Sequence, residues 1–595
     1  RHVVQLRFSA DYADVFEVRG FQRKKRGTIQ PFSLKNETLI YSYLGLDGEL
    51  RQTHIIFSQP PNRLVDGAAE FDVALGPKES FTVEVRIHCM QPSDPLPHPN
   101  PYTHYNTGFE ALTRKMREAR GRACSITTSN EVFNQWLDRS FEDLQMLLTQ
   151  TDSGSYPYAG TPWFSTPFGR DGIVTALECL VIDPQIANGV LSFLASTQAT
   201  AYEPERDAEP GKVIHEVRQG EVSQLNELPF GRYYGSVDAT PLFVYLAGAY
   251  FQRTGDLELI RGLWPNIQAA LAWIEGDGDK DQDGYVEYGR QAPLGLVHQG
   301  WKDSKDPVFH SDGTSAQGPI ALCEVQAYVY GAWMQAASLA NALGLHADAI
   351  ALQQKAHDLQ IRFDRDFWCE DIGTYAIALD GQKRPCRIQT SNAGQCLFSA
   401  IALPHRAPLI AEQLLNDANY SGWGVRTLAA NEQRYNPLSY HNGSVWPHDN
   451  ALIAYGFSRY GLQHHASRLL EDLFQASSNF DLHRLPELFC GFPKRTGEGP
   501  TLYPVACNPQ AWAAGAVFMI LQATLGLVIN DKESTVEFHS PVLPPCLDEI
   551  VMKKLRVGTG SADLRLRRYN QGVSVDLLHA DKDIRLHIIK QTRPE

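Results

Sequence analysis

The chain has 595 residues, of which 43% are hydrophobic and 21% charged, the composition of a globular protein rather than a disordered or fibrous one. This length allows about four domains of ordinary size, or one large unit with smaller attachments. The net charge of −14 argues against nucleic acid or an anionic membrane as the main partner. Aromatic residues reach 10%, which suits stacking on a polyhydroxylated ligand, although such residues are equally common in cores.

Ten cysteines are scattered along the chain without a Cys-x-x-Cys pair. This usage indicates reduced, buried thiols in a cytoplasmic protein rather than a disulfide framework or a zinc site. No apolar run approaches the roughly 20 residues of a membrane span, and no secretory segment is visible near Arg1. We therefore expect a cytoplasmic protein without a membrane partner.

The first 90 residues are predicted to form an antiparallel β-sandwich. Val4, Leu6 and Phe8 alternate with polar residues, and residues 81–89 do the same, a period of two that buries one face of a strand. Because the chain starts within such a pattern, we expect the sandwich domain, residues 1–90, to be incomplete at its first strand. Residues 91–124 are predicted to be a linker, since five prolines fall between positions 92 and 101.

Residues 125–528 change to helical periodicity, and the last segment, 529–595, returns to alternation and predicts a small β appendage. Twelve helices joined by several long loops do not suit a four-helix bundle. We predict a mainly α protein, an (α/α)6 barrel of six inner and six outer helices whose loops at one end build a pocket. The predicted helices are 128–150, 171–182, 185–198, 237–254, 256–275, 317–343, 346–366, 391–402, 405–416, 448–460, 463–478 and 507–526.

The first unusual loop runs from Trp163 to Gly172 and contains an Arg-Asp pair at a predicted helix start. Arg170 and Asp171 are candidates for hydrogen bonds to sugar hydroxyls, with Trp163 and Phe168 as flanking rings. The alternative is a capping carboxylate with a surface ion pair.

Two further loops carry candidate catalytic carboxyls. Asp303 follows Trp301 and Lys302, and a carboxyl beside an aromatic ring in a partly dry cleft can hold a proton near neutral pH. The alternative is a solvated loop aspartate. Glu487 lies in the apolar sequence Leu485-Pro-Glu-Leu-Phe, which is costly unless the carboxyl is paired or functional.

A fourth block, residues 440–450, gathers aromatic, amide and imidazole groups at a loop-to-helix junction. His441, Asn442, Trp446 and His448 are candidates for hydroxyl contacts or for positioning a water, and the alternative is hydrogen bonds that lock the loop. Metal and acyl-enzyme chemistry are disfavoured, because the chain has neither a second histidine at helical spacing nor a G-x-S-x-G elbow. Phosphate-binding glycine loops are also missing, so we expect neither a metal nor a cofactor.

An acidic run, Asp277 to Asp283, imitates the start of a calcium loop. The twelfth position counted from Asp279 is Arg290 rather than the bidentate Glu that an EF-hand needs, so an EF-hand is rejected. A turn after a helix and a calcium site of another type both remain open.

These four blocks, with Tyr503-Pro-Val-Ala-Cys-Asn-Pro-Gln-Ala-Trp512, resemble the bacterial amylo-α-1,6-glucosidase (glycogen debranching-like) proteins. Those proteins belong with the glucoamylase-type (α/α)6-barrel glycoside hydrolases, and the resemblance covers almost the whole chain. It implies an inverting glycosidase that releases glucose from α-glucosides, α-1,6-linked ones in particular. It also implies Asp303 as general acid, Glu487 as general base, and Arg170 and Asp171 as the residues that hold the terminal sugar.

Two alternatives stay open. One is a sucrose or other small-disaccharide hydrolase, because the same scaffold serves neutral invertases. The other is a catalytically silent carbohydrate-binding protein. In the leading interpretation Asp303 and Glu487 face one pocket that also exposes Arg170, Asp171 and Trp301, with the two carboxyls about 6.5–9.5 Å apart.

Overall fold

The computed structural model describes residues 2–35, 38–65, 67–90, 105–570, 572–581 and 583–590. Contacts divide the chain into two compact units. The first holds residues 1–119 together with 218–231, and the second holds residues 120–217 and 232–595. The sequence patterns did not predict that residues 218–231 belong to the N-terminal unit. None of the described helices combines the length and hydropathy that a membrane span requires.

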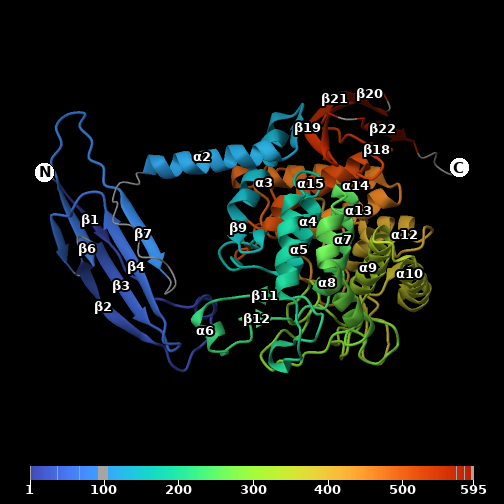
Figure 1. Cartoon of the computed structure of the whole chain (residues 1–595), viewed down its shortest axis with the longest axis horizontal. Coiled ribbons are helices and arrows are strands. Elements are labelled where there is room, and N and C mark those ends of the chain that lie inside the picture. Colours follow the sequence, from blue (N-terminus) through green and yellow to red (C-terminus); the bar gives the residue numbers. More distant parts are fainter. Residues whose placement is uncertain are drawn as a thin grey trace. The chain divides into compact units, whose positions relative to one another are not determined.

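The N-terminal unit contains the predicted antiparallel sandwich (Figure 1). Apolar residues of its two sheets, including Leu39 and Ile55 from one and Phe71 from the other, form a small core of their own. One sheet has the order β2-β3-β4-β7, formed by Thr28–Lys35, Thr38–Leu44, Leu50–Phe57 and Val85–Met90. The other has the order β1-β6-β5, formed by His2–Arg7, Ala68–Val73 and Arg63–Val65. The alternation at residues 81–89 is only partly realised, because Ile87 is 59% exposed and Cys89 is also exposed.

Residues 218–231, which we call the strap, pack on the sandwich. The strap contains the short helix α6 (Glu221–Gln224). The Arg23 guanidinium donates to Glu221 at 2.9 Å and to Glu227 at 2.6 Å. The carboxylate of Asp14, which also caps helix α1 (Val15–Val18), accepts the Val222 amide at 3.2 Å. Buried ion pairs and backbone capping therefore fix the strap to the N-terminal unit.

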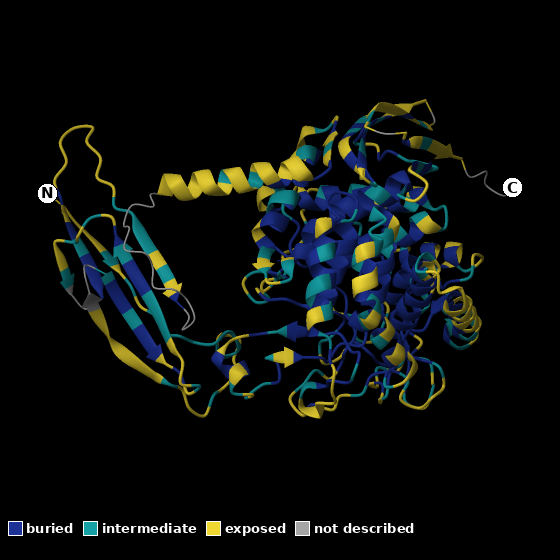
Figure 2. Ribbon diagram, viewed as in Figure 1, coloured by how far each residue is buried: buried dark blue, intermediate teal, exposed yellow. Residues whose placement is uncertain are grey.

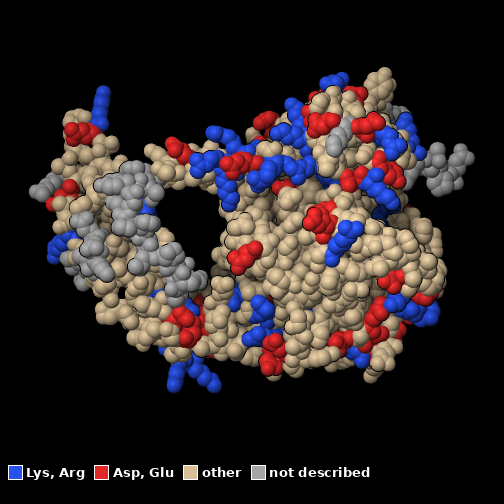
Figure 3. All heavy atoms as spheres, viewed as in Figure 1, with Lys and Arg blue, Asp and Glu red and all other residues tan. Residues whose placement is uncertain are grey.

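The prolines of the predicted linker lie outside the described residues, but the helix that follows them is described. That helix, α2 (Tyr105–Arg122), occupies most of the second half of the predicted linker and was not expected. Only Ala119 of α2 is buried, although Phe109, Leu112 and Met116 recur along it at helical spacing. Lys and Arg side chains gather along it (Figure 3), contributed by Arg114, Lys115, Arg117, Arg120 and Arg122.

The second unit contains the predicted (α/α)6 barrel, and each of the twelve predicted helices is found. Within the described chain the inner helices contact one another in the order α4, α7, α9, α11, α13, α15 and back to α4, which closes the ring. Most of their residues are dark blue in Figure 2, because other helices and loops surround the inner ring. The inner helices are Gly169–Cys179, Ala239–Thr254, Cys323–Ala342, Asn392–Phe398, Pro447–Arg459 and Ala511–Leu525. The outer helices are α3, α5, α8, α10, α12 and α14: Glu131–Leu147, Gln185–Thr197, Leu257–Glu275, His346–Phe367, Ala407–Leu414 and Gln463–Ser477.

The carboxyl ends of the inner helices surround a cavity of about 250 Å³. Two arginines that line it bind backbone carbonyls at these ends, as expected for cations placed at the negative end of a helix dipole. Arg253 donates to the Leu180 carbonyl at 3.0 Å, and Arg459 donates to the Phe398 carbonyl at 2.9 Å. This end of the barrel is therefore closed by capping interactions.

Short strands connect the helices at the opposite end. They are β9 to β16: Leu148–Thr151, Gly154–Pro157, Glu216–Val217, Arg232–Tyr233, Ala321–Leu322, Trp368–Cys369, Thr374–Tyr375 and Ala378–Leu379, and the chain also has the 3-10 turns Pro204–Arg206 and Asp481–His483. The pair β11 and β12 matters for the fold, because the strap leaves the barrel unit from one and returns to the other.

The C-terminal strands share the barrel's core rather than forming a separate one. Strand β8 (Ser125–Thr128), predicted to open the barrel, instead pairs with β19. One sheet has the order β21-β20-β19-β8, with Gly572–Ala580, Gly560–Tyr569 and Glu549–Val557 as its C-terminal strands. The other is β17-β18-β22: Leu527–Asn530, Thr535–His539 and Arg585–Ile589.

Candidate active site

Arg170 connects the two loops predicted to bind sugar and to supply an acid. One of its terminal nitrogens donates to the Asp303 carboxylate at 2.9 Å, and the other contacts Asp238 at 3.1 Å and the Gly300 carbonyl at 3.0 Å. The Asp303 side chain keeps 26% of its surface exposed, so it remains within reach of a ligand. The guanidinium thus orients the Asp303 carboxyl through one of its oxygens and leaves part of the carboxyl exposed.

Local packing at the start of α4 places Arg170. Gly169 lies so close to the preceding loop that a Cβ there would be 2.0 Å from the Ile214 carbonyl oxygen. Its amide instead donates to the His215 carbonyl at 2.9 Å. Only glycine permits this approach, which packs the first turn of α4 against the loop of Ile214 and His215. From this position the Arg170 side chain reaches Asp303.

Glu487 is held between two hydrogen-bond donors. The Tyr440 hydroxyl donates to one carboxylate oxygen, and the Cys507 amide donates to the other at 2.8 Å. Val445 and Phe489 exchange backbone hydrogen bonds of 2.9 and 3.1 Å, which join the 440–450 block to the loop of Glu487. Hydrogen bonds of this kind favour the ionised form of a carboxyl.

The two carboxyls act on the same neighbours. Burial raises the pKa of Tyr440 well above its usual value, and the charges of Glu487 and Asp303 raise it further. Burial also raises the pKa of Asp171 to about 7, with Arg170 opposing and with Asp303 and Glu487 both adding to the rise. Two loops that are distant in sequence therefore converge on one site.

Acidic side chains surround this site at the amino ends of the inner helices. Asp171, Glu324 and Asp449 lie in the first turns of α4, α9 and α13, and Asp238 precedes α7. Within the described chain, none of the six inner helices is capped by the side chain of its own N-cap residue. The helix dipoles therefore favour negative charge at this end of the barrel.

A buried lysine lies within this acidic ring. Lys302 donates to the Thr427 carbonyl at 2.6 Å. Burial lowers its pKa, and the charges of Asp449 and Glu324 oppose that shift. Burial likewise raises the pKa of Asp303, although Arg170 opposes it. The site thus combines Asp303, whose raised pKa favours the protonated form, with Glu487, which accepts two hydrogen bonds.

Comparison with known proteins identifies the family. The family model described as the mannosylglycerate hydrolase MGH1-like glycoside hydrolase domain matches residues 170–489, more than half of the chain. The chain belongs to this family. Residues 1–86 match the N-terminal domain of some glycogen debranching enzymes, in agreement with the resemblance of the five sequence blocks. No curated protein matches the chain.

Solved structures agree with the fold. A GH78 family rhamnosidase of Bacillus sp. GL1 matches with a TM-score of 0.57 and 13% identity, over 94% of this chain and 54% of that one. A sialidase matches with a TM-score of 0.57 and 11% identity, over 91% and 52%. The chain therefore spans about half the length of these two proteins. A mannosylglycerate hydrolase of Thermus thermophilus matches with a TM-score of 0.47 and 16% identity, over 64% of this chain and 99% of that one.

The MGH1-like domain begins at Arg170 and ends two residues after Glu487, so it contains both candidate carboxyls. Several predicted sugar contacts are buried within it rather than exposed. Trp301 is 3% exposed and meets the His448 ring edge-to-face at 5.2 Å. His448 in turn stacks on Trp512 with 3.6 Å between ring centres. Arg170, Asp171 and Trp301, which we expected one pocket to expose, are each largely buried, and the rings of His448 and Trp512 pack behind them.

The remaining predicted residues also have structural contacts. The His441 ring lies parallel to Trp446 at 5.2 Å. Burial lowers the pKa of both His441 and His448 well below the usual value, which favours the neutral imidazole. The Asn442 amide donates to the Asp306 carbonyl at 3.3 Å. Two rings come from the first loop: Trp163 is half-buried and donates to the Val505 carbonyl at 3.1 Å, whereas Phe168 is buried and precedes α4.

Sequence reasoning missed several residues of the site. Tyr440 stood inside the quoted block, next to His441, and only its contact with Glu487 distinguishes it. Asp238 and Glu324 lie outside the quoted blocks, and an acidic residue at a helix start is too common to single out. The Cys507 contribution is a backbone amide, which no side-chain pattern can reveal.

The acidic loop after α8 has a simple partner. The Lys383 ammonium lies 2.9 Å from Asp281 and 2.7 Å from Asp283, and it also contacts Glu287. Asp279 accepts the Asp283 and Gly284 amides at 3.1 and 2.9 Å. The Lys383 ammonium offsets part of the charge of these carboxylates, and the Asp279 contacts show that they belong to a turn.

Proposed function

We propose that the protein is an inverting glycoside hydrolase that releases glucose from α-glucosides, with α-1,6-linked gluco-oligosaccharides as leading substrates. The observation that carries the proposal is that the loops of Asp303 and Glu487 meet at the 440–450 block: the Ser304 amide donates to His441 at 3.3 Å, and the Tyr440 hydroxyl donates to Glu487. Membership of a glycoside hydrolase family supports the reaction class. The match of residues 1–86 to a domain of glycogen debranching enzymes supports an α-glucan substrate.

In the proposed reaction Asp303 is the general acid. It gives its proton to the glycosidic oxygen as the bond between this oxygen and the anomeric carbon breaks. Burial, which raises the pKa of Asp303, helps it to keep that proton before the reaction. Arg170 positions the carboxyl and limits the rise, so that the proton can still be released.

Glu487 is the proposed general base. Its carboxylate accepts a proton from a water that attacks the anomeric carbon on the face opposite the leaving group, and the sugar is released with inverted configuration. The Tyr440 hydroxyl and the Cys507 amide donate to the two carboxylate oxygens and fix the direction of the group. Arg170 and Asp171 are proposed to hold the terminal sugar.

The family description favours a second substrate, mannosylglycerate. Its glycerate carboxylate would need a cation near the leaving group. Arg170 is already paired with Asp238 and Asp303, and Lys302 is buried among acidic residues. The charge of the site therefore favours an uncharged glycoside. Isomaltose, maltooligosaccharides, sucrose and mannosylglycerate form the panel that separates these substrates, and turnover of none of them would favour a silent binding protein.

Two variants test the division of labour. Glu487→Gln is expected to lose activity on every glycoside by about two to four orders of magnitude, because it keeps the shape but removes the base. Asp303→Asn is expected to lose natural glycosides by a similar factor but to retain much of its activity on α-glucosyl fluoride, whose leaving group needs little protonation. Asp306→Asn, an exposed carboxyl of the same loop, is the matched control and is expected to behave as wild type.

The measurements are kcat/KM on both substrate types and the anomer released, followed by proton NMR. Release of the β-anomer from an α-glucoside supports inversion. Release of the α-anomer contradicts the mechanism. If both variants retain the same fraction of wild-type activity on α-glucosyl fluoride, the assigned roles are contradicted.

A further inference from the structure

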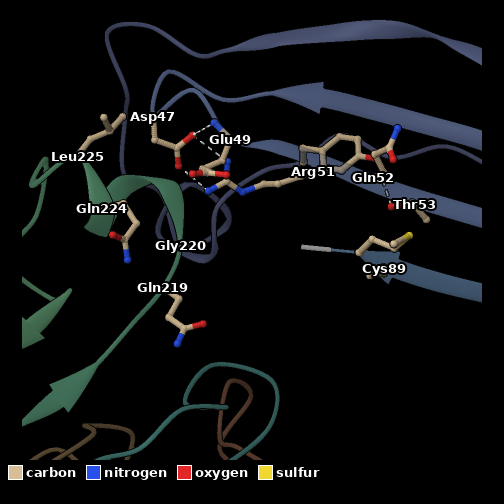
Figure 4. Close-up of a pocket in the computed structure, with 12 residues that line it drawn as sticks. Asp47, Glu49, Arg51, Gln52, Thr53, Cys89, Gln219, Gly220, Gln224 and Leu225 are labelled. Carbon is tan, nitrogen blue, oxygen red and sulfur yellow. Dashed lines mark hydrogen bonds and ion pairs between the residues drawn. The ribbon is translucent and has the colours of Figure 1, made fainter. Parts of the chain in front are cut away.

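A large cavity lies in the N-terminal unit, between the four-stranded sheet and the strap (Figure 4). Its volume is about 990 Å³, at the upper end of the range of ligand pockets. In Figure 4, Gln219 and Gln224 of the strap lie on one side, and Arg51 and Cys89 of the sheet lie on the other. None of these residues belongs to the candidate active site.

The wall formed by the strap is rigidly attached. The Glu221 carboxylate is 5% exposed and accepts from Arg23 at 2.9 Å, from the Tyr43 hydroxyl at 2.7 Å and from the Leu46 amide at 2.6 Å. A buried carboxyl with three donors has one stable position. The neighbouring residues Gln219 and Gln224 are therefore presented on a fixed backbone, and a ligand would meet a preformed cavity.

The lining carries both hydrogen-bond donors and acceptors. Arg51 donates to Asp47 through two nitrogens, at 3.0 and 2.6 Å. Glu49 is exposed beside this pair. The side-chain amides of Gln219 and Gln224 are exposed and form no hydrogen bond within the described residues. Each amide can donate and accept at once, which is the pattern that vicinal sugar hydroxyls require.

The same lining disfavours other ligand classes. The cavity's one guanidinium is neutralised by Asp47, and Glu49 leaves an excess of negative charge, so a phosphate or another anion is repelled. Leu225 and Met90 are its large aliphatic residues, too few for a lipid or an apolar helix. Tyr12 supplies a flat ring, stacked on Tyr43 at 5.4 Å, of the kind that packs against a sugar face.

We propose that this cavity is a non-catalytic binding site for a neutral oligosaccharide. The proposal rests on the proposed function, because it identifies the ligand as a segment of the same α-glucan that the barrel would hydrolyse. Such a site would hold a long glucan on the protein between turnovers. It would therefore affect polymeric substrates and leave small aryl glucosides unaffected.

Cys89 provides a direct probe, because it lines the cavity and is the exposed thiol among the ten cysteines. Cys546 is half-buried and serves as an internal reference, and the other eight are buried. The rate of Cys89 alkylation by N-ethylmaleimide is measured by peptide mass spectrometry on the full chain, with and without maltoheptaose. The Glu487→Gln variant is used so that the ligand is not consumed.

We expect maltoheptaose to slow the alkylation of Cys89 several-fold and to leave that of Cys546 unchanged. The double variant Gln219→Ala/Gln224→Ala should need about tenfold more ligand for the same protection, since it loses two sets of hydrogen bonds. Gln353→Ala/Gln354→Ala, on the outer helix α10, is the matched control and should need no more than the parent.

Absence of protection at saturating maltoheptaose would overturn the proposal, and so would equal protection by inorganic phosphate or an unaltered response of the cavity double variant. The two proposals fail separately. Protection of Cys89 in a protein that hydrolyses no glycoside would reject the enzyme and keep the cavity site. Hydrolysis of α-glucosides without protection of Cys89 would reject the cavity site alone.

Discussion

Single buried charges at the candidate site lower the free energy of unfolding. Asp171 is 6% exposed, and its pKa is raised to about 7 because burial disfavours the carboxylate more than Arg170 favours it. Asp303 and Glu487, which also raise it, are the groups whose chemistry the site is proposed to perform. A carboxyl that is costly to ionise is therefore retained at the position where a sugar would be held.

This cost predicts a gain in stability when the charge is removed. The folded pKa of Asp171 lies above that of the unfolded chain, so its contribution to stability is complete below about pH 4 and is lost as the pH rises through 7. Asp171→Asn should therefore match the wild type near pH 4 and exceed it at pH 8 by about 2–4 kcal/mol. Its hydrolytic activity should fall at the same time.

Urea unfolding at pH 4, 6 and 8 measures this difference. Asp348→Asn, at the exposed amino end of α10, is the matched control and should show at most about 0.5 kcal/mol at any pH. A stability difference for Asp171→Asn that is constant over this range would contradict the assigned protonation.

At the scale of elements, the inner ring depends on helices that approach closely. Gly456 of α13 faces α11, and a Cβ at this position would be 2.7 Å from both the Leu397 Cβ and the Phe398 amide nitrogen. A backbone atom cannot move aside as a flexible side chain can. Gly262, on the outer helix α8, has no atom within 4 Å of the corresponding position.

The two glycines should respond to alanine in opposite directions. Gly456→Ala should destabilise the barrel by about 2–3 kcal/mol through overpacking against α11. Gly262→Ala should stabilise it by about 0.5–1 kcal/mol, because alanine is the better helix former where space is free. Thermal unfolding of the two variants side by side checks both signs, and a stabilising Gly456→Ala would show that the ring is looser than described.

At the scale of the whole molecule, the chain leaves the barrel unit after β11 and returns at β12, and the strap between them packs in the N-terminal unit. Arg23 holds the strap through two carboxylates while its own side chain is 1% exposed. Removing one member of a buried charge cluster leaves the others without compensation. The N-terminal unit therefore depends on a segment that lies more than a hundred residues further along the chain.

Arg23→Ala should lower the stability of the N-terminal unit by about 3–5 kcal/mol, chiefly because Glu221 remains buried and unpaired. Amide hydrogen exchange in α6 should become faster, since the helix loses its anchor to the sheet. Lys24→Ala, the exposed neighbour, is the control and should change neither measurement. Unchanged exchange in α6 after Arg23→Ala would show that Asp14 and the Phe16–Phe230 stack suffice to hold the strap.

The sequence alone determined the local structure of this protein. Period-two alternation gave the sandwich strands, helical periodicity gave all twelve barrel helices, and their number favoured the closed ring. The candidate carboxyls Asp303 and Glu487 also followed from their loops and from the family resemblance, and their roles stay predictions. Helix α2 was missed, although Phe109, Leu112 and Met116 recur along it at helical spacing, because the prolines between positions 92 and 101 indicated a linker for the whole of residues 91–124.

The tertiary structure decided which distant segments meet. The return of the strap to the sandwich, the pairing of β8 with β19 and the ion pairs of the acidic loop with Lys383 each join segments that no local pattern relates. It also decided that Trp301 and His448 support the site from within rather than line its surface. The physical reason is that periodicity reports which face of an element is apolar, whereas burial and charge compensation depend on what lies opposite that face in the folded chain.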